Sequence, residues 1–174
     1  MPKKSDRGTV IRELTTDAEL AASVDIIRQS FLTVADELGI TAENWANYAG
    51  FITLEGLKEQ QDSGRRFFGL FENDRQVGFV VVSAVEEKKC WFGKLAVLPD
   101  VRHKGYGRKL VEFAVDLGRS LGAERISLGL VEDNARLKRW YESLGFRTTR
   151  TLRPEGMNWD VSFMEKEVAP ESPR

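Results

Sequence analysis

The segment from Lys94 to Leu110 constrains the fold more than any other part of the chain. An apolar run, Leu95–Leu98, leads into a basic loop with glycines at 105 and 107, and a helical pattern follows. Glycine lets the backbone adopt positive φ and approach a ligand closely. The N–H groups at a helix start, together with the helix dipole, favour an anion there. The segment therefore predicts a strand, a phosphate-binding loop and a helix, with a plain turn and a solvated basic face as the alternative.

The first third of the chain has the apolar spacing of helices. Thr16-Asp-Ala-Glu19 is the pattern of a capping box, in which residues 16 and 19 satisfy each other's backbone N–H groups. We predict a helix that begins after Thr16, runs to Leu38 and ends at Gly39. A second helix is predicted over residues 42–62 with Thr41 as its cap, and its irregular apolar stripe indicates a break into two pieces.

From Arg65 onward the spacing changes to that of strands alternating with helices. Three stretches rich in Phe, Val and Trp are separated by polar turns, which predicts an antiparallel meander over residues 65–71, 76–85 and 90–98. After a helix that ends at Gly122, we predict a strand at 125–131, a short helix around 137–144, and strands at 148–152 and 159–166. With a further strand at 10–14, this mixed order predicts helices layered on one central sheet.

Composition limits the class of protein. The chain has 174 residues, 41% hydrophobic and 30% charged, so we expect one domain over residues 1–174 with flexible ends at 1–8 and 168–174. A net charge of −1 argues against a strongly basic nucleic-acid binder. The single cysteine, Cys90, fits a reducing compartment, and the single histidine, His103, excludes a metal site that needs two imidazoles. Without a long apolar run or a signal-peptide pattern, we expect a cytoplasmic protein with no metal and no membrane partner.

Two separate stretches of the sequence match short motifs that are known from other proteins. Arg102-His-Lys-Gly-Tyr-Gly107 matches the pattern Q/R-x-x-G-x-G/A, and Leu95-Ala-Val97 stands just before it. Downstream, residues 134–146 match the pattern N-x6-Y-E-x-x-G-F, and Phe163-Met-Glu-Lys166 closes the chain's last predicted strand. In this order the motifs resemble the GNAT superfamily of N-acetyltransferases. The resemblance implies an α+β fold of GNAT type: a mixed, mostly antiparallel sheet of six or seven strands, about four helices, and splayed fourth and fifth strands.

The resemblance also implies an activity and a set of site residues. It implies transfer of an acetyl group from acetyl-CoA directly to a primary amine, which we expect to be a small molecule. Tyr141 would protonate the leaving thiolate, and the backbone N–H of Val97 would stabilise charge on the thioester oxygen. The residues implied to bind acetyl-CoA are Leu95, Ala96, Val97, Arg102, His103, Lys104, Gly105, Tyr106, Gly107, Arg108 and Asn134.

The general base and the acceptor stay open in the sequence. Many family members carry an acidic residue just before the Leu-Ala-Val segment, whereas Trp91-Phe-Gly-Lys94 holds none. Between Glu13 and Asp62 there are ten acidic and two basic residues, which either wall a site for a cationic amine or form solvated helix faces. The aromatic residues of this region either line an acceptor pocket or belong to the core; they are Phe31, Trp45, Tyr48 and Phe51.

Three other functions compete with acetylation of a small amine. One is acetylation of a protein lysine or N-terminus, and another is a catalytically silent acyl-CoA sensor of the same fold. The third, a nucleic-acid-binding module, is disfavoured by the charge balance and by the lack of a basic-aromatic stripe. We therefore expect an amine substrate and no nucleic acid as partners, and a homodimer is left open.

Overall fold

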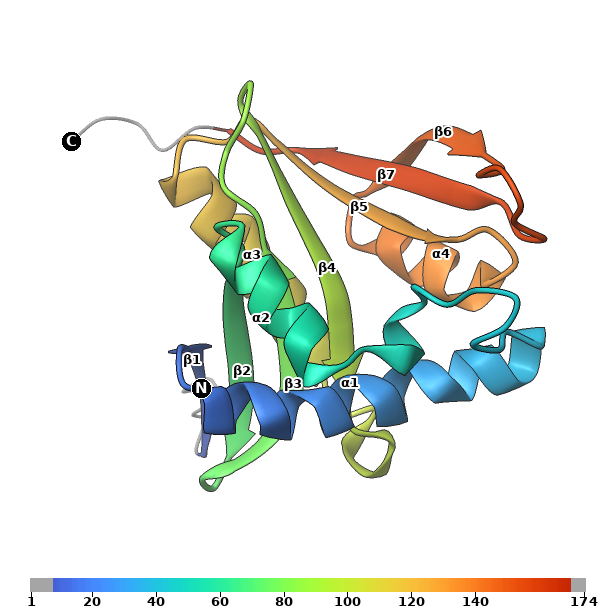
Figure 1. Cartoon of the computed structure of the whole chain (residues 1–174). Coiled ribbons are helices and arrows are strands. Elements are labelled where there is room, and N and C mark those ends of the chain that lie inside the picture. Colours follow the sequence, from blue (N-terminus) through green and yellow to red (C-terminus); the bar gives the residue numbers. More distant parts are fainter. Residues whose placement is uncertain (1–7, 170–174) are drawn as a thin grey trace.

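The computed structural model describes residues 8–169, which form one seven-stranded sheet with the strand order β1-β2-β3-β4-β5-β7-β6 (Figure 1). Neighbouring strands are antiparallel except β4 and β5, which are parallel. The strands are β1 (Thr9–Leu14), β2 (Arg66–Glu72), β3 (Arg75–Val82), β4 (Lys89–Val97), β5 (Arg125–Val131), β6 (Arg147–Leu152) and β7 (Val161–Glu167). The predicted mixed, mostly antiparallel sheet is confirmed.

Four α-helices accompany the sheet within the described residues. They are α1 (Asp17–Leu38), α2 (Leu54–Asp62), α3 (Tyr106–Ser120) and α4 (Ala135–Ser143), with short 3₁₀ turns at Ala49–Phe51 and Pro99–Val101. Helices α1 and α2 lie in front of the sheet in Figure 1, whereas α3 lies behind it. Side chains that are almost wholly buried fill the layers between them, among them Leu20 and Ile27 of α1, Phe79 of β3 and Leu110 of α3. None of the helices in this part of the chain is long and apolar enough to cross a membrane.

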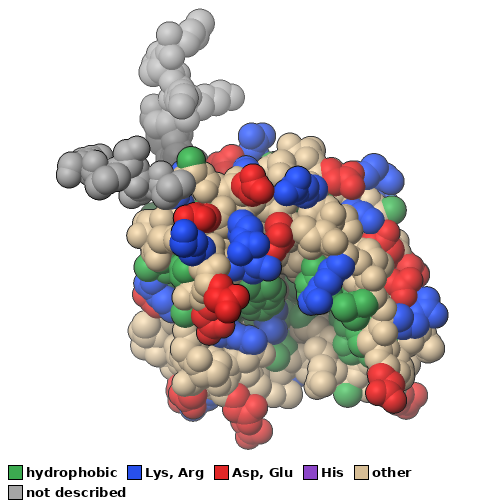
Figure 2. Space-filling model, turned by 90° about the horizontal axis from the view of Figure 1, so that it is seen from above, with side chains coloured by type: hydrophobic (Ala, Val, Ile, Leu, Met, Phe, Trp, Pro, Cys, Tyr) green, Lys and Arg blue, Asp and Glu red, His purple; other side chains and the backbone are tan. Residues whose placement is uncertain are grey.

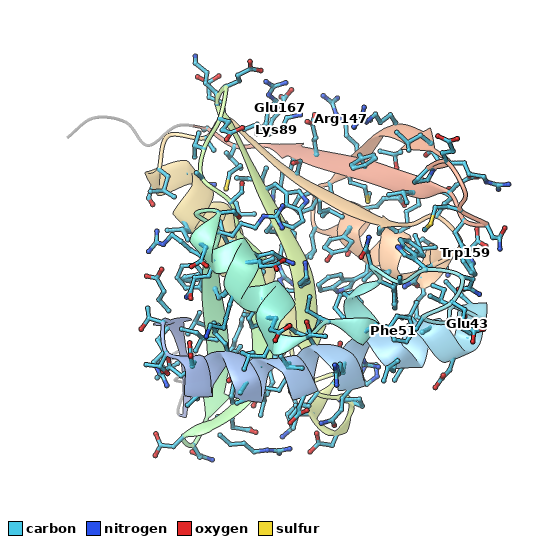
Figure 3. All side chains as sticks on the ribbon, viewed as in Figure 1. Glu43, Phe51, Lys89, Arg147, Trp159 and Glu167 are labelled. Carbon is cyan, nitrogen blue, oxygen red and sulfur yellow. The ribbon has the colours of Figure 1, made fainter. Side chains whose placement is uncertain are left out.

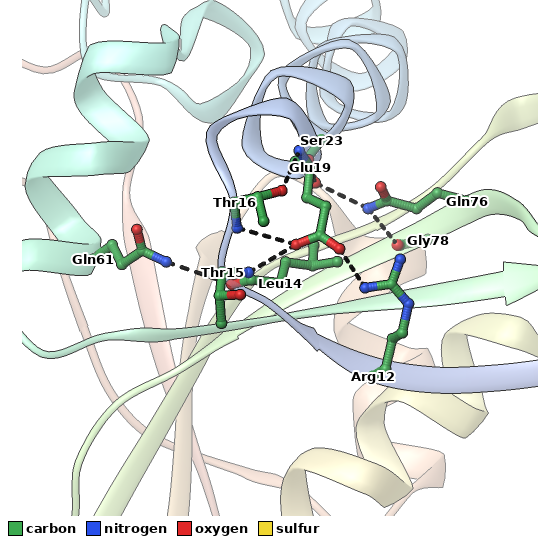
Figure 4. A network of polar contacts seen from close by, with 9 residues as sticks. All are labelled: Arg12, Leu14, Thr15, Thr16, Glu19, Ser23, Gln61, Gln76 and Gly78. Atoms are coloured by element: carbon green, nitrogen blue, oxygen red, sulfur yellow. Dashed lines mark hydrogen bonds and ion pairs between the residues drawn. The ribbon is translucent and has the colours of Figure 1, made fainter.

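The start of α1 confirms the predicted capping box (Figure 4). The Thr16 hydroxyl accepts from the N–H of Glu19, whose carboxylate in turn accepts from the N–H groups of Thr15 and Thr16 at 2.9 and 3.1 Å. Arg12 of β1 forms an ion pair with the same carboxylate. These donors favour the charged form, so they lower the pKa of Glu19 from 4.5 to about 2, with Arg12 as the largest cause. The network therefore ties the first strand to the first helix.

The predicted second helix is wrong in its first half. Thr41 caps no helix, because its hydroxyl accepts from the N–H of Asn44 within a turn, and α2 begins only after Thr53, whose hydroxyl accepts from the N–H of Gly56. Tyr48, in the segment between α1 and α2, is buried, and its hydroxyl donates to the Phe31 carbonyl of α1 at 3.2 Å. Burial of the aromatic side chains in this segment thus replaces a regular helix there.

The predicted flexible ends largely fall outside the described residues. Where they reach into the described part, the backbone is bonded to the sheet region. The carbonyl of Gly8 accepts from the N–H of Asn73 at 3.0 Å, and the N–H of Val168 donates to Glu124 at 2.9 Å. Val168 is also buried, and the flexibility of the two ends stays a prediction.

Candidate active site

The site begins where β4 and β5 separate. Their parallel pairing covers only Lys89–Trp91 of β4 and Arg125–Ser127 of β5. Beyond Trp91 and Ser127 the two strands diverge, and a cavity of about 1150 Å³ lies between them. Its wall includes Phe92–Leu95 and Val97 of β4 and Leu128–Val131 of β5. The splayed fourth and fifth strands that the resemblance implies are therefore present.

A bulge in β4 shapes the same wall. The register with β3 shifts between Phe79 and Val81, so two residues of β4, Lys94 and Leu95, lie opposite Val80. Lys94 adopts a φ of 47°, a value that non-glycine residues seldom take. Leu95 and Val97 line the cavity, while the side chain of Ala96 is buried in the core instead. The bulge thus turns consecutive β4 residues toward the cavity.

The predicted phosphate loop lies at the start of α3 and lines the cavity. Gly105 is the N-cap of α3 with a φ of 83°, and His103 also adopts a positive φ of 67°. The first backbone hydrogen bond of the helix joins Lys109 N–H to the Gly105 carbonyl at 3.1 Å. The N–H groups of Gly107 and Arg108 therefore have no carbonyl one turn earlier to bond. A Cβ built on Gly105 would meet no atom within 4 Å, so open space lies above this backbone.

Arg102 connects this loop to α1. Its guanidinium donates to the Ser30 carbonyl at 3.0 Å and to the Thr33 hydroxyl at 3.3 Å. Burial of the guanidinium lowers the pKa of Arg102, and the nearby Glu37 carboxylate opposes that change. Arg102, the first residue of the motif, therefore holds the loop against α1. Some of its hydrogen-bond donors are used by that helix.

A second pair of contacts holds the loop on its other side. The Tyr106 hydroxyl donates to the Glu72 carboxylate of β2, and the Lys104 ammonium lies 3.4 Å from the same carboxylate. Hydrogen bonding by Tyr106 is the largest cause of a lowered pKa of Glu72. Lys104 does not line the cavity, so its side chain serves this ion pair.

Tyr141 lies in α4 with its ring among aromatic side chains. The ring centroid is 4.9 Å from that of Trp140, 5.8 Å from that of Phe146 and 6.2 Å from that of Phe92. Tyr141 lines the cavity, and its hydroxyl forms no hydrogen bond within residues 8–169. Burial raises the pKa of Tyr141, so the phenol stays protonated throughout the neutral pH range. Packing of the ring in the core is therefore compatible with the expected role of the hydroxyl as a proton donor.

Asn134 also lines the cavity, at the N-cap of α4. Its side-chain oxygen accepts from the N–H of Leu137 at 3.3 Å. The amide oxygen is thus used by the helix, and its amino group is the part left for a ligand. Ten of the twelve residues predicted for the site line this one cavity, all except Ala96 and Lys104.

The acidic residues between Glu13 and Asp62 do not form a wall of the cavity. Of the ten, only Glu37 lines it, while nine are exposed and Glu19 serves the capping box. Several are engaged with basic partners elsewhere, such as Glu13 with Arg66 at 2.8 Å. The structure therefore favours solvated helix faces over a site for a cationic amine. Figure 2 shows acidic and basic side chains interspersed on one face, around a hollow with hydrophobic side chains.

Carboxylates are scarce in the cavity itself. No acidic residue precedes Leu95 on β4, and the acidic residues that line the cavity are Glu37 and Asp133. Sequence reasoning did not single out Asp133, although its place directly before Asn134 in a recognised motif is a usable signal. It also assigned no side-chain role to Lys94, which the β4 bulge brings to the cavity.

The aromatic residues of the α1–α2 connection belong to both the cavity and the core. Phe31, Trp45 and Tyr48 line the cavity, and the Trp45 and Trp159 rings stack with centroids 5.9 Å apart. Burial raises the pKa of Tyr48 to about 12. Figure 3 shows Trp159, which precedes β7, beside the segment that carries Glu43 and Phe51. The connection before α2 and the segment before β7 thus meet at Trp45 and Trp159, and Trp45 lines the cavity.

Comparisons with known proteins agree with this arrangement. The sequence matches the Acetyltransferase (GNAT) family over residues 27–146. It is 32% identical over 94 residues to the [ribosomal protein bS18]-alanine N-acetyltransferase of Escherichia coli (strain K12), a match that covers 53% of this chain and 63% of that protein.

Solved structures show the same fold. The crystal structure of the Escherichia coli ribosomal-protein-S18-alanine N-acetyltransferase superposes with a TM-score of 0.72 and 22% identity, over 95% of this chain and 99% of that one. The PaiA N-acetyltransferase of Thermoplasma acidophilum, solved in complex with coenzyme A, gives a TM-score of 0.75 and 22% identity, over 92% and 99%. The family predicted from the motifs is confirmed: this chain belongs to the GNAT family of acetyltransferases.

Proposed function

We propose that the protein is an N-acetyltransferase that transfers the acetyl group of acetyl-CoA directly to a primary amine. The observation that carries the proposal is the single cavity that joins the separated β4 and β5 strands, the loop at the start of α3, and Tyr141. Family membership supports the same reaction. Acetyl-CoA supplies an activated acyl group as a thioester, so the protein has to bind it, orient it and admit the amine.

The residues of the cavity fit acetyl-CoA. The N–H groups of Gly107 and Arg108 lack intrahelical acceptors, and open space lies above Gly105, as a bound pyrophosphate requires. Between β4 and β5, Leu95 and Val97 have left the parallel ladder, so backbone groups there are available to the amides of the pantetheine arm. Arg102 and Tyr106 hold the loop in place from two sides through α1 and β2.

Different groups of the chain then act on the thioester oxygen, the leaving sulfur and the acceptor ammonium. The backbone N–H of Val97 stabilises the negative charge that develops on the thioester oxygen. The Tyr141 hydroxyl, kept protonated by burial and without a protein partner, donates its proton to the sulfur that leaves. Glu37 and Asp133 are the carboxylates in the cavity that a water molecule can connect to the ammonium of the acceptor.

A second candidate is acetylation of a protein N-terminus. Its support is the name of the similar Escherichia coli protein, which acetylates an alanine of a ribosomal protein. Trp45, which lines the cavity, is held by stacking on Trp159, and an aromatic wall of this kind suits either a small amine or a chain terminus. A cytoplasmic location is part of the same proposal, and the homodimer stays an expectation.

A turnover screen tests the proposal. The purified full chain and acetyl-CoA are incubated with amino acids, polyamines, aminoglycosides, lysine peptides and peptides with free N-termini, and products are read by mass spectrometry. We expect one class of amine to gain a single acetyl group in an acetyl-CoA-dependent manner. Binding of acetyl-CoA with no acetylated amine in any class would instead favour a silent acyl-CoA sensor.

A further inference from the structure

Lys94 lines the cavity, and like Arg136 and Arg139 it has no role in the proposed chemistry; of the three, it is the one on β4. It sits in the β4 bulge, where its φ of 47° departs from strand geometry, and its side chain lines the cavity. A strained non-glycine residue in a cavity wall is where backbone cost is often balanced by function. The contacts of its ammonium therefore indicate what the side chain can bind.

The ammonium of Lys94 meets an uncharged partner. Its Nζ donates to the side-chain oxygen of Gln60 in α2 at 3.0 Å, and no carboxylate of residues 8–169 lies within ion-pair distance. Burial disfavours the charged form, and Arg65 repels it, so the pKa of Lys94 falls from 10.5 to about 8. A half-buried ammonium with an amide as its protein partner retains donors for an anion.

Arg65 brings a second positive charge to the same place. Its guanidinium lies 5.1 Å from the centroid of the Trp91 ring, and Trp91 lines the cavity. Arg65 likewise has no acidic partner in the described part of the chain. Neighbouring basic residues do: Arg66 binds Glu13, and Lys58 binds Asp17 at 2.7 Å. Two unneutralised cations thus converge where β4 faces α2.

This place is distinct from the phosphate loop. Lys94 bonds Gln60 of α2, whereas the loop is bonded to α1 through Arg102 and to β2 through Tyr106. The cavity therefore has positive charge at Lys94 as well as at the loop. The loop suits a pyrophosphate, and the Lys94 side is left to the acceptor.

We propose that Lys94, together with Arg65, forms an anion-binding subsite, and that the acceptor is a primary amine that also carries an anionic group such as a carboxylate. The inference rests on the proposed acetyl transfer and narrows its substrate class. It agrees with the position of nine of the ten acidic residues between Glu13 and Asp62 outside the cavity, because a cluster of them would have suited a purely cationic amine; the tenth, Glu37, is left for the ammonium of the acceptor.

Matched acceptors test the inference. Free amino acids are compared with their amides, and peptides with Asp at position two are compared with the same peptides carrying Asn there. The first set reports a small-molecule acid and the second a protein terminus. We expect the carboxylate member of at least one set to be preferred about ten- to a hundredfold in kcat/KM, as one charge-assisted hydrogen bond implies.

Variants assign the preference to Lys94. Lys94→Met should abolish the preference by raising KM for the anionic acceptor, with KM for acetyl-CoA unchanged, and Lys94→Arg should retain most of it. Lys58→Met, which removes an exposed lysine paired with Asp17, is the matched control and should behave as the wild type. Loss of kcat at unchanged KM in both Lys94 variants would show that Lys94 handles a proton, and would overturn the subsite.

Other outcomes separate the inference from the proposed function. Acetylation of amides or spermidine as fast as of carboxylate-bearing amines would overturn the inference and leave the acetyltransferase intact. If no amine is acetylated, glutarate and inorganic phosphate are titrated calorimetrically into CoA-saturated protein, with glutaramide as the uncharged comparison. Equal affinities of wild type and Lys94→Met for both anions would overturn the subsite, and weaker binding by the variant would support it.

Discussion

Trp91 of β4 and Ser127 of β5 form the last parallel pair before the two strands separate. Every residue proposed to act on acetyl-CoA lies on or beyond this point: the β4 wall, the α3 loop that follows β4, and α4 that follows β5. The divergence exposes backbone groups that a continuous sheet would pair internally. A break in one ladder thus supplies both the cavity and the free hydrogen-bonding groups that line it.

Substitution of Gly105 by valine should weaken acetyl-CoA binding at least tenfold. A side chain there would project into the open space where we place the pyrophosphate, and it would strain a backbone with φ of 83°. Gly122→Val is the matched control, because Gly122 also has a positive φ of 94° and open space but follows the far end of α3. Calorimetric titration of both variants checks this, and equal affinity for the two would contradict the loop assignment.

Tyr141→Phe should lower kcat by about a hundredfold, the scale of a positioned general acid. The melting temperature should stay close to that of the wild type, because the hydroxyl forms no hydrogen bond within residues 8–169. Steady-state kinetics, acetyl-CoA affinity and thermal melting are measured together. An unchanged kcat would remove the proton-donor role, and a large drop in melting temperature would show that the hydroxyl is structural.

Arg102→Ala should reduce the free energy of unfolding by about 1.5–3 kcal/mol, since its charged donors bond groups of α1. It should also weaken acetyl-CoA binding by releasing the loop. Arg75→Ala provides the comparison, because the Arg75–Asp100 pair is exposed, and such pairs contribute only about 0–1 kcal/mol. Chemical denaturation distinguishes the two, and equal losses would argue against the anchoring role of Arg102.

The capping box predicts a specific dependence of stability on pH. The pKa of Glu19 is lowered to about 2 in the folded chain, against 4.5 for the free group. The contribution of the Glu19 carboxylate to the free energy of unfolding is therefore complete above about pH 4.5, and it is lost as the pH falls from there toward 2. Glu19→Gln should be less stable at neutral pH and show a flatter stability profile in this window.

Asp25→Asn is the control for that measurement. Asp25 is exposed on the same helix and has no ion pair within the described range. Denaturant melts between pH 2 and 7 should leave this variant with the wild-type slope. A wild-type slope in Glu19→Gln as well would show that Glu19 does not contribute the expected linkage.

Local patterns predicted most elements because their causes are local. The capping box of α1, the glycine that ends it, and the strand at 125–131 depend on residues close in sequence. The predicted start of the second helix was wrong because Thr41 and Thr53 are equally good caps by residue type. The choice between them is made by Tyr48, which packs against α1 and donates to Phe31, a contact between residues far apart in the chain.

The site residues, too, were predictable where a local motif carries them and not where tertiary packing places them. The loop at the start of α3 and Tyr141, which line the cavity, could be named from the sequence because short motifs carry them. The role of Arg102 as an anchor to Ser30, and the approach of Lys94 to Gln60, depend on how α1 and α2 dock on the sheet. Such docking leaves no mark at a fixed sequence spacing, so only the folded chain shows it.

The central claim is that acetyl-CoA binds in the cavity between β4 and β5 with its pyrophosphate on the α3 loop. Titration of acetyl-CoA into ¹⁵N-labelled protein tests this most directly. We expect saturable shifts of the Gly105, Gly107 and Arg108 amides together with those of Leu95 and Val97. Saturable binding that leaves these amides unshifted, or no binding at all, would contradict it.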